Sequence, residues 1–343
     1  MNYQHLPPLG WQPFFQQQLS LDEWEREQPA RVVDYQRSVF SVHDGERITT
    51  LAITPNTPEM TVGDWVLLDA EGHFSRLLER SSLFARKAAG SRVATQLIAA
   101  NIDSVFIVCS LNQDFSLNRI ERYLALAHEA GVEPVVVLSK ADLCATPDTF
   151  LQQVTALDPL LQAVLVNGLD ADSCAALAPW CGSGRTVALM GSSGVGKSTL
   201  VNTLLGRSVQ HTSAIRGDDD EGRHTTTSRS LHPLTGGGLL IDTPGMRELQ
   251  LADCAQGVEA TFADISELAQ HCRFPDCQHQ SEPGCAITAA IETGELDARR
   301  LASFHKLMRE QAMNAATLAE KRAHSRKLGK LYRSVQSHKP GRK

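Results

Sequence analysis

A run of eight residues has the types and the spacing of a phosphate-binding loop. Gly191-Ser192-Ser193-Gly194-Val195-Gly196-Lys197-Ser198 fits the pattern G-x-x-x-x-G-K-[ST]. In this pattern the glycines let backbone N–H groups curl around phosphate oxygens, the lysine reaches the β- and γ-phosphates, and the hydroxyl ligates Mg2+. An apolar run over residues 186–190 precedes the motif, and a helical pattern starts at Lys197. This context favours a nucleotide site that extends to Thr199 over a chance glycine-rich turn.

A carboxylate stands where such a site needs one for its metal ion. Asp242 follows an apolar run over residues 239–241 and opens the tetrapeptide Asp-Thr-Pro-Gly. This is the place of the Asp that organises Mg2+ in P-loop nucleotidases. Between the two motifs lies the loop 222–227, from which the hydroxyl of Thr226 could complete the magnesium shell. Such a loop would order with a triphosphate and relax after hydrolysis, and a polar surface loop is the alternative.

A second motif is a candidate for binding the base of the nucleotide. It is Ser139-Lys140-Ala141-Asp142, at the C-terminal end of an apolar run over residues 134–138. Open α/β sheets bind their ligands at this end of the strands. The Asp142 carboxylate can accept hydrogen bonds from N1–H and from the exocyclic amine of guanine, a donor pair that adenine lacks. The four residues resemble the Asn/Thr-Lys-x-Asp motif of GTPases, with Ser139 as a departure that predicts weaker affinity. Taken alone, they could also be a helix-start turn.

Three cysteines and one histidine gather within fourteen residues, in the spacing Cys272-x4-Cys277-x-His279-x5-Cys285. Three sulfurs and one nitrogen suit tetrahedral Zn2+, and a closed set of four ligands implies a structural ion. The segment is rich in turn-forming residues, so a metal would order a region with little core of its own. Free cysteines are often small buried hydrophobes instead, which is our interpretation of the other five: Cys109, Cys144, Cys174, Cys181 and Cys254.

Apolar periodicity predicts the elements that position these motifs. Short, often β-branched runs broken by turn signals fill residues 31–87 and predict a small β-barrel. Beyond Arg92, strands and helices alternate, which is typical of a parallel sheet covered by helices. From residue 251 the pattern is helical around the cysteine-rich loop. The expected strands of the sheet are residues 104–109, 134–138, 163–166, 186–190 and 239–241, and the expected helices are residues 117–129, 150–157, 172–180 and a helix from Lys197.

Charge is distributed unevenly along the chain. The 343 residues carry a formal net charge of -6 and are 42% hydrophobic and 21% charged, which excludes collagen-like, disordered and small disulfide-rich proteins. Residues 299–343 hold thirteen Lys and Arg against two Glu, a local charge of +11 that leaves -17 on residues 1–298. This basic tail predicts contact with RNA phosphates, with a solvated face as the alternative. No apolar run reaches about 18 residues, so we expect a cytoplasmic protein without membrane contact.

The order of the motifs is unusual, because Asp142 precedes Lys197 and Asp242 comes last. In ordinary GTPases the phosphate loop comes first and the guanine motif follows. Moving the chain ends within a compact domain preserves its core, so the sheet can still form. With a barrel in front and a Cys/His loop behind, the chain resembles the RsgA (YjeQ) family of circularly permuted, ribosome small-subunit-dependent GTPases. The resemblance covers about residues 31–309.

This resemblance implies an architecture and a set of partners. It implies an N-terminal segment (1–30), an OB-fold domain (31–90), a circularly permuted G domain (91–250) and a helical zinc-binding domain with the basic tail (251–343). It also implies a monomer that binds GTP and GDP, the small (30S) ribosomal subunit and its 16S rRNA, and that assists late maturation of this subunit. One structural Zn2+ would be held by Cys272, Cys277, His279 and Cys285, and Mg2+ would accompany GTP at Ser198 and Thr226.

Met246 stands where many GTPases carry the Gln that orients the attacking water. An apolar side chain cannot do this, so we expect slow hydrolysis by the free protein and faster hydrolysis on the subunit, with His224 or a ribosomal group orienting the water. The expected catalytic residues are Lys197, Ser198, Asp242 and His224. Two alternatives stay open: a P-loop ATPase or kinase, which Ser139 allows, and an RNA-binding assembly factor with a vestigial nucleotide site.

Overall fold

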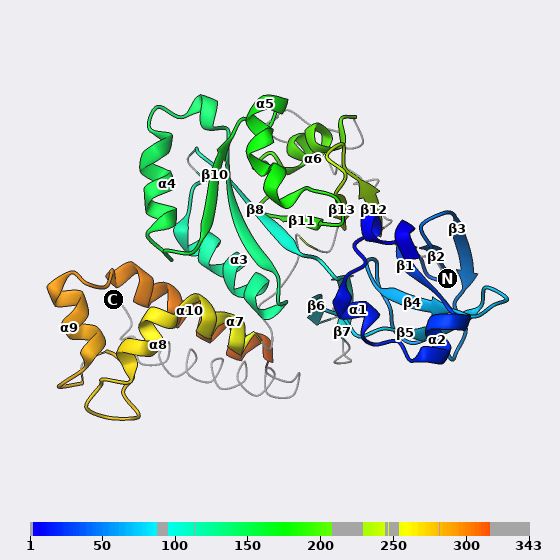
Figure 1. Ribbon diagram of the computed structural model, residues 1–343. Coiled ribbons are helices and arrows are strands. Elements are labelled where there is room, and N and C mark those ends of the chain that lie inside the picture. Colours follow the sequence, from blue (N-terminus) through cyan, green and yellow to red (C-terminus); the bar gives the residue numbers. More distant parts are fainter. Residues whose placement is uncertain are drawn as a thin grey trace, which may run out of the picture. The chain divides into compact units, whose positions relative to one another are not determined.

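The computed structural model describes residues 3–87, 95–112, 114–207, 229–243, 246, 254–280 and 282–315 (Figure 1). The predictions for His224, for Thr226 and for the basic tail beyond residue 315 concern residues outside these ranges. The chain forms two compact units. The first unit comprises Met1–Ala85, Leu97–Leu249 and Gln256–Ala263, and the second comprises Arg86–Gln96, Gln250–Ala255 and Asp264–Lys343.

Antiparallel strands form the early part of the first unit, as the turn-rich pattern of residues 31–87 predicts. The N-terminal segment packs against them, because Trp11 and Phe15 share a small core with Trp65. Trp11 and Trp65 meet edge to face, with ring centroids 4.8 Å apart. The elements are η1 (Tyr3–His5), η2 (Pro7–Leu9), α1 (Pro13–Gln16), α2 (Leu21–Arg26), β1 (Gln28–Tyr35), β2 (Val39–His43), β3 (Ile48–Ala52), β4 (Trp65–Leu68) and β5 (Phe74–Leu77).

Five parallel strands form one end of the sheet, in the order β10-β9-β8-β11-β13. The predicted alternation of strands and helices is confirmed, and the expected helix over residues 172–180 is divided into α5 and η4. The elements are β8 (Ser104–Ser110), α3 (Leu117–Glu129), β9 (Glu133–Ser139), η3 (Ala141–Leu143), α4 (Pro147–Thr155), β10 (Gln162–Val166), α5 (Ala171–Cys174), η4 (Ala175–Trp180), β11 (Thr186–Met190), α6 (Lys197–Leu205) and β13 (Leu239–Asp242).

Helices cover both faces of this parallel sheet. Successive side chains of a strand point to opposite faces, so a strand buried on both sides is apolar at every position. In β8, Phe106 and Val108 belong to the core that contains residues of α6, whereas Ile107 and Cys109 belong to the core that contains residues of α3 and α4. The carboxyl ends of β8, β9, β11 and β13 therefore meet at one edge, between two layers of helices.

An antiparallel strand that the sequence pattern did not predict joins the parallel strands to the barrel strands. β12 (Arg229–Pro233) pairs with β13 and also with β1, so one sheet continues from β10 to β3. The missed strands β6 (Leu83–Lys87) and β7 (Thr95–Ala100) form a separate two-stranded sheet. Strand β12 follows a segment of more than twenty residues without apolar periodicity, so local sequence gave little sign of it.

Arg31 lies buried at this junction, with 1% of its surface exposed. Its guanidinium donates to the carbonyl oxygens of Leu9, Gly63 and Asn101 and to the Thr186 hydroxyl, at 2.5–3.3 Å. Burial lowers the pKa of Arg31 to about 10, which leaves the group charged at neutral pH. Because Thr186 begins β11, Arg31 ties strand β1 to the strand that leads into the phosphate-loop motif.

The helical pattern after residue 251 is confirmed for the described residues. Helix α7 (Ala255–Thr261) contacts α3, because the backbone N–H of Gly257 donates to Glu129 Oε2 at 2.8 Å. The remaining helices are α8 (Ala263–Ala269), α9 (Ala286–Thr293) and α10 (Ala298–Ala315). Within the second unit, Arg300 of α10 is buried and forms a bidentate ion pair with Asp264 at 2.5 and 2.8 Å.

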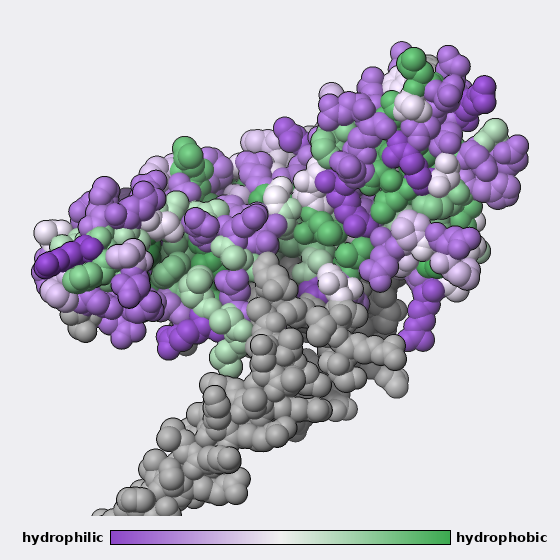
Figure 2. Space-filling model, turned by 90° about the horizontal axis from the view of Figure 1, so that it is seen from below, coloured by the Kyte–Doolittle hydropathy of each residue, from purple (hydrophilic) through white to green (hydrophobic). Residues whose placement is uncertain are grey.

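The face of the molecule shown in Figure 2 is covered largely by hydrophilic side chains, with hydrophobic side chains visible between them. Some apolar side chains are highly exposed, among them Leu21, Leu160 and Leu169 at more than 80%. In the part of the chain that the structure describes, no helix combines the length and the apolar character needed to cross a bilayer.

Candidate nucleotide and metal sites

The phosphate-loop motif connects the end of β11 to the start of α6. Gly191 has φ of +144°, and a Cβ at this position would lie 2.4 Å from the carbonyl oxygen of Val108. Gly196 precedes α6 with φ of +96°, a left-handed conformation that favours glycine. These two glycines let the loop turn sharply, so that the N–H groups at the beginning of α6 face the loop.

Lys197 is nearly buried, with 6% of its surface exposed. Its ammonium group donates to the carbonyl oxygen of Gly191 at 2.8 Å and to that of Ser192. The side chain therefore folds back over the first two residues of the loop. A buried ammonium group at this place is suited to pair with phosphate oxygens, and Ser198 and Thr199 follow it in the first turn of α6.

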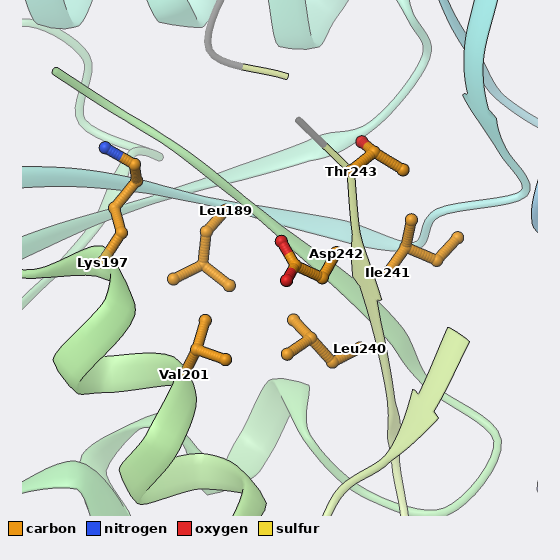
Figure 3. A pocket seen from close by; sticks show the side chains of 7 residues that line it. All are labelled: Leu189, Lys197, Val201, Leu240, Ile241, Asp242 and Thr243. Carbon is orange, nitrogen blue, oxygen red and sulfur yellow. The ribbon is translucent and has the colours of Figure 1, made fainter. Parts of the chain in front are cut away.

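A small cavity of about 20 Å3 lies between the ends of α6 and β13. Figure 3 shows the Lys197 ammonium group on one side and the Asp242 carboxylate turned from β13 toward the side of α6. The neighbouring Thr243 is 4% exposed, and its hydroxyl has no hydrogen-bond partner in the structure as described. Because a buried polar group without a partner is costly, an ion or a phosphate oxygen beside Thr243 would offer this hydroxyl a partner. The rest of the lining is apolar and consists of Leu189, Val201, Leu240 and Ile241.

The guanine-type motif contacts the phosphate loop directly. The Ser139 hydroxyl donates to the carbonyl oxygen of Val195 at 2.6 Å, and the Lys140 ammonium group donates to that of Gly194 at 3.0 Å. Lys140 adopts a left-handed conformation with φ of +58°, after which the chain enters η3 with Ala141 and Asp142. Asp142 is exposed. The motif thus holds the loop with its first two residues and leaves a carboxylate at the surface beside it.

The loop after β10 lies beside α6 as well. The hydroxyl of Thr203 donates to the carbonyl oxygen of Gly168 at 2.6 Å. A Cβ built on Gly168 would lie 3.8 Å from the Thr199 side chain, so the two segments are in close contact. The ends of β9, β10 and β11 therefore bring Asp142, Gly168 and the phosphate loop to one edge of the sheet.

Met246 is buried, with 2% of its surface exposed. Its backbone N–H donates to the carbonyl oxygen of Thr243 at 3.2 Å. An apolar, buried side chain at this position does not present a hydrogen-bonding group to a water molecule.

One residue that contacts the phosphate loop was not predicted from the sequence. Arg119, in the first turn of α3, donates from Nη1 to the Ser192 hydroxyl at 2.8 Å. The helix itself was predicted, but no local sequence pattern indicates a contact between residues that lie 73 positions apart. The available clue was that α3 follows β8, so that the helix starts at the ligand-binding edge.

In the second unit, the four predicted metal ligands converge. The ligand atoms of Cys272, Cys277, His279 and Cys285 lie within 4.8 Å of one another. His279 Nδ1 is 3.6 Å from the sulfurs of Cys272 and Cys285, which are 3.9 Å apart. Tetrahedral Zn2+ with ordinary bond lengths separates its ligands by about 3.5–3.8 Å. The donor set and its spacing fit one metal ion.

Cys285 has a second feature of a metal ligand. It caps the N-terminus of α9, where its sulfur accepts a hydrogen bond from Thr288 N at 3.4 Å. Burial raises the pKa of the thiol, but the hydrogen bonds of Thr288, His279 and Cys277 together outweigh this effect, and the pKa falls to about 6. The thiolate is the form that binds metal, so the helix end favours the binding form. Of the five other cysteines, Cys144 is half-buried and the rest are buried.

One part of the expected basic surface is corrected by the structure. Arg300 is one of the cations of the basic tail predicted for residues 299–343. It is buried and paired with Asp264, because its planar guanidinium links α10 to α8. Its role is therefore structural, and the exposed Arg309 is a better representative of the basic part of α10.

Comparison with known proteins agrees with this geometry. Residues 77–252 match the RsgA GTPase family. The small ribosomal subunit biogenesis GTPase RsgA 2 of Vibrio parahaemolyticus is 61% identical over 334 residues, which cover 97% of this chain and 93% of that protein. The Mesorhizobium japonicum protein named small ribosomal subunit biogenesis GTPase RsgA is 48% identical and covers 90% of each chain.

A solved structure shares the fold. The crystal structure of YjeQ from Thermotoga maritima matches with a TM-score of 0.61 at 24% identity and covers 83% of this chain and 98% of that chain. The expected α/β fold of a permuted GTPase is thus confirmed, with the phosphate loop behind the guanine-type motif in the chain. The sequence match and the shared fold lead to one conclusion: the chain belongs to the RsgA GTPase family.

Proposed function

We propose that this protein is a GTPase that binds the small ribosomal subunit, assists its late maturation and leaves after hydrolysing GTP to GDP and phosphate. The observation that carries the nucleotide part is the pair of contacts from Ser139 and Lys140 to the phosphate loop. These contacts join the guanine-type motif to the phosphate loop, and they support our proposal that both belong to one nucleotide site. The ribosomal part follows from the relatives, which are named small ribosomal subunit biogenesis GTPases.

In this proposal the loop N–H groups of residues 191–199 hold the phosphates, and Lys197 moves from the Gly191 and Ser192 carbonyl oxygens to the β- and γ-phosphates. Asp142 accepts the two guanine donors. Adenine offers no such pair, so bound ATP would leave the carboxylate without partners. The attraction between the Lys197 ammonium group and the phosphoryl oxygens strengthens as negative charge develops on them. Lys197 therefore stabilises the transition state of phosphoryl transfer.

Polar groups at and beside the cavity suit Mg2+. Asp242 lines the cavity with a carboxylate, and the buried Thr243 hydroxyl needs a polar neighbour. Ser198, the residue after Lys197 in α6, would supply a hydroxyl from the loop motif. Oxygen ligands of this kind are those that Mg2+ prefers. When bound, the ion would neutralise charge on the β- and γ-phosphates. Thr226 would add a further hydroxyl, and His224 would orient the attacking water; both stay predictions.

We further propose that the Cys/His cluster holds one structural Zn2+. Three thiolates and an imidazole leave no open coordination position for chemistry. The segment between α8 and α9 has few hydrophobic residues to hold it, so the ion would contribute the order that a core provides elsewhere. The zinc segment and the tail with its charge of +11 would then form the part of the protein that meets 16S rRNA. We expect a cytoplasmic monomer.

The experiment compares GTP and ATP, each with and without purified small subunits, for binding and for release of phosphate. The proposal predicts GTP-selective binding, slow hydrolysis by the free protein because Met246 cannot orient water, and clear stimulation by small subunits. Turnover of ATP would identify a P-loop ATPase or kinase. Subunit binding that is independent of nucleotide, without hydrolysis, would identify an assembly factor with a vestigial site. Either result would contradict the proposal.

A further inference from the structure

Arg119 reaches the phosphate loop from a helix that is remote in sequence. It is the third residue of α3 and is half-buried, and its Nη1 lies 2.8 Å from the Ser192 hydroxyl. In the part of the chain that the structure describes, Arg119 forms no ion pair with a carboxylate. Within these described residues, its guanidinium is directed at the Ser192 hydroxyl of the loop.

The contact lies at a defined end of the loop. Lys197, the residue that reaches the β- and γ-phosphates in this motif, donates to the carbonyl oxygens of Gly191 and Ser192. The first two loop residues therefore mark the end of the site where the γ-phosphate belongs. Lys140 contacts Gly194 instead, further along the loop. Arg119 and Lys197 thus bring two cations to the γ-phosphate end.

Helix α3 is held firmly at its other end. Glu129 Oε2 accepts a hydrogen bond from Gly257 N at 2.8 Å, and His128 Nδ1 lies 3.0 Å from the Thr261 hydroxyl. A Cβ on Gly257 would lie 2.0 Å from the carbonyl oxygen of Ala125, so α3 and α7 pack at close range. The buried Ile120 and Leu124 fix the same helix on the sheet. Because these contacts fix α3, Arg119 can hold the Ser192 hydroxyl in a defined position.

We infer that Arg119 is a positioning residue for GTP hydrolysis. It acts through Ser192, whose hydrogen bond fixes the γ-phosphate end of the loop in the geometry that Lys197 and the triphosphate require. Preorganised donors of this kind lower the cost of forming the charged transition state, because little reorganisation is left for the reaction itself. GDP lacks the γ-phosphate, so its binding depends little on this end of the loop. The inference rests on the proposed GTPase activity.

The test compares R119A, S192A and the double variant for single-turnover GTP hydrolysis by the free protein, and for affinity toward GDP and a non-hydrolysable GTP analogue. We expect R119A to lower the hydrolysis rate and the analogue affinity by about tenfold, as for a lost charge-assisted hydrogen bond, with GDP affinity within about twofold. S192A should likewise lower the hydrolysis rate and the affinity for the GTP analogue while leaving the affinity for GDP nearly unchanged. The double variant should be no worse than R119A, because both substitutions remove one interaction.

Two further variants separate positioning from folding. R119K keeps the charge and a donor and should recover most of the lost rate, whereas R37A, an exposed arginine between β1 and β2, should match the parent protein. An R119A protein with unchanged hydrolysis would overturn the inference, and so would equal losses of GDP and analogue affinity or additive effects of R119A and S192A. A parent protein that does not hydrolyse GTP would instead contradict the proposed function.

Discussion

The Ser139 hydroxyl donates to the carbonyl oxygen of Val195 at 2.6 Å, which joins the end of β9 to the phosphate loop. In the more usual form of this motif Asn or Thr, each with a larger side chain than Ser, stands at the position of Ser139. Here a short side chain makes the contact, because the two backbones approach closely: a Cβ on Gly196 would lie 3.8 Å from the same hydroxyl. The departure from the usual motif thus retains a hydrogen bond between the base-reading and phosphate-binding segments.

Substitution S139A should weaken nucleotide binding without changing selectivity between GTP and GDP. Ser139 is buried, and its loss leaves a carbonyl oxygen of the loop without this donor. Because the contact supports the middle of the loop rather than its γ-phosphate end, we expect both affinities to fall by roughly fivefold, the equivalent of about 1 kcal/mol. Titration with fluorescent GDP and a GTP analogue measures this. A loss of affinity for the GTP analogue alone, with GDP affinity unchanged, would contradict this account, because it would mean that Ser139 supports the γ-phosphate end of the loop.

Substitution D142N should change the base that is read. An amide cannot accept both guanine donors, but it can donate to the 2-oxo group of xanthine. We expect GTP affinity to fall at least about tenfold and XTP affinity to rise above that for GTP. Competition between the two nucleotides for the parent and variant proteins checks the exchange. If D142N still prefers GTP over XTP, Asp142 does not bind the base. S139A is the control, because it weakens the phosphate loop without changing the base-binding carboxylate.

Removal of the metal should affect the second unit and spare the nucleotide. Substitution C277S breaks the set of four ligands, so we expect loss of one zinc equivalent and a fall of roughly 5–10 °C in the melting temperature of the second unit. GTP affinity should stay within about twofold of the parent value. Metal analysis and calorimetry provide the measurements. C144S, at a half-buried thiol outside the cluster, is the matched control, and equal zinc content in C277S would refute the assignment.

Substitution R31A should destabilise the first unit strongly. The buried guanidinium satisfies three carbonyl oxygens and the Thr186 hydroxyl, which alanine would leave without these donors. Breaking such a buried network costs about 3–5 kcal/mol in the free energy of unfolding. Denaturant unfolding of R31A beside the exposed-site control R37A measures the difference. A change below about 1 kcal/mol would mean that the junction between β1 and β11 contributes little to stability.

Motifs and periodicity predicted the central part of the fold well. Strand Thr186–Met190 and helix Leu117–Glu129 match the expected ranges, because apolar residues on strands buried on both faces and on amphipathic helices follow a strict local pattern. Strand β12 and the continuity of the sheet into β1 were missed, since edge pairing depends on contacts between remote segments. Arg119 was missed for the same reason. The pairing of Arg300 with Asp264 also depends on how two helices pack, which charge counting along the chain does not reveal.

The rate of GTP hydrolysis with and without small ribosomal subunits tests the central proposal most directly. Single-turnover hydrolysis should be slow for the free protein, should rise at least about tenfold with small subunits, and should be unaffected by equal amounts of large subunits. The K197A variant should lose the stimulated reaction, because Lys197 supplies the charge opposite the β- and γ-phosphates. A rate that is the same with small subunits, large subunits and neither would contradict the account.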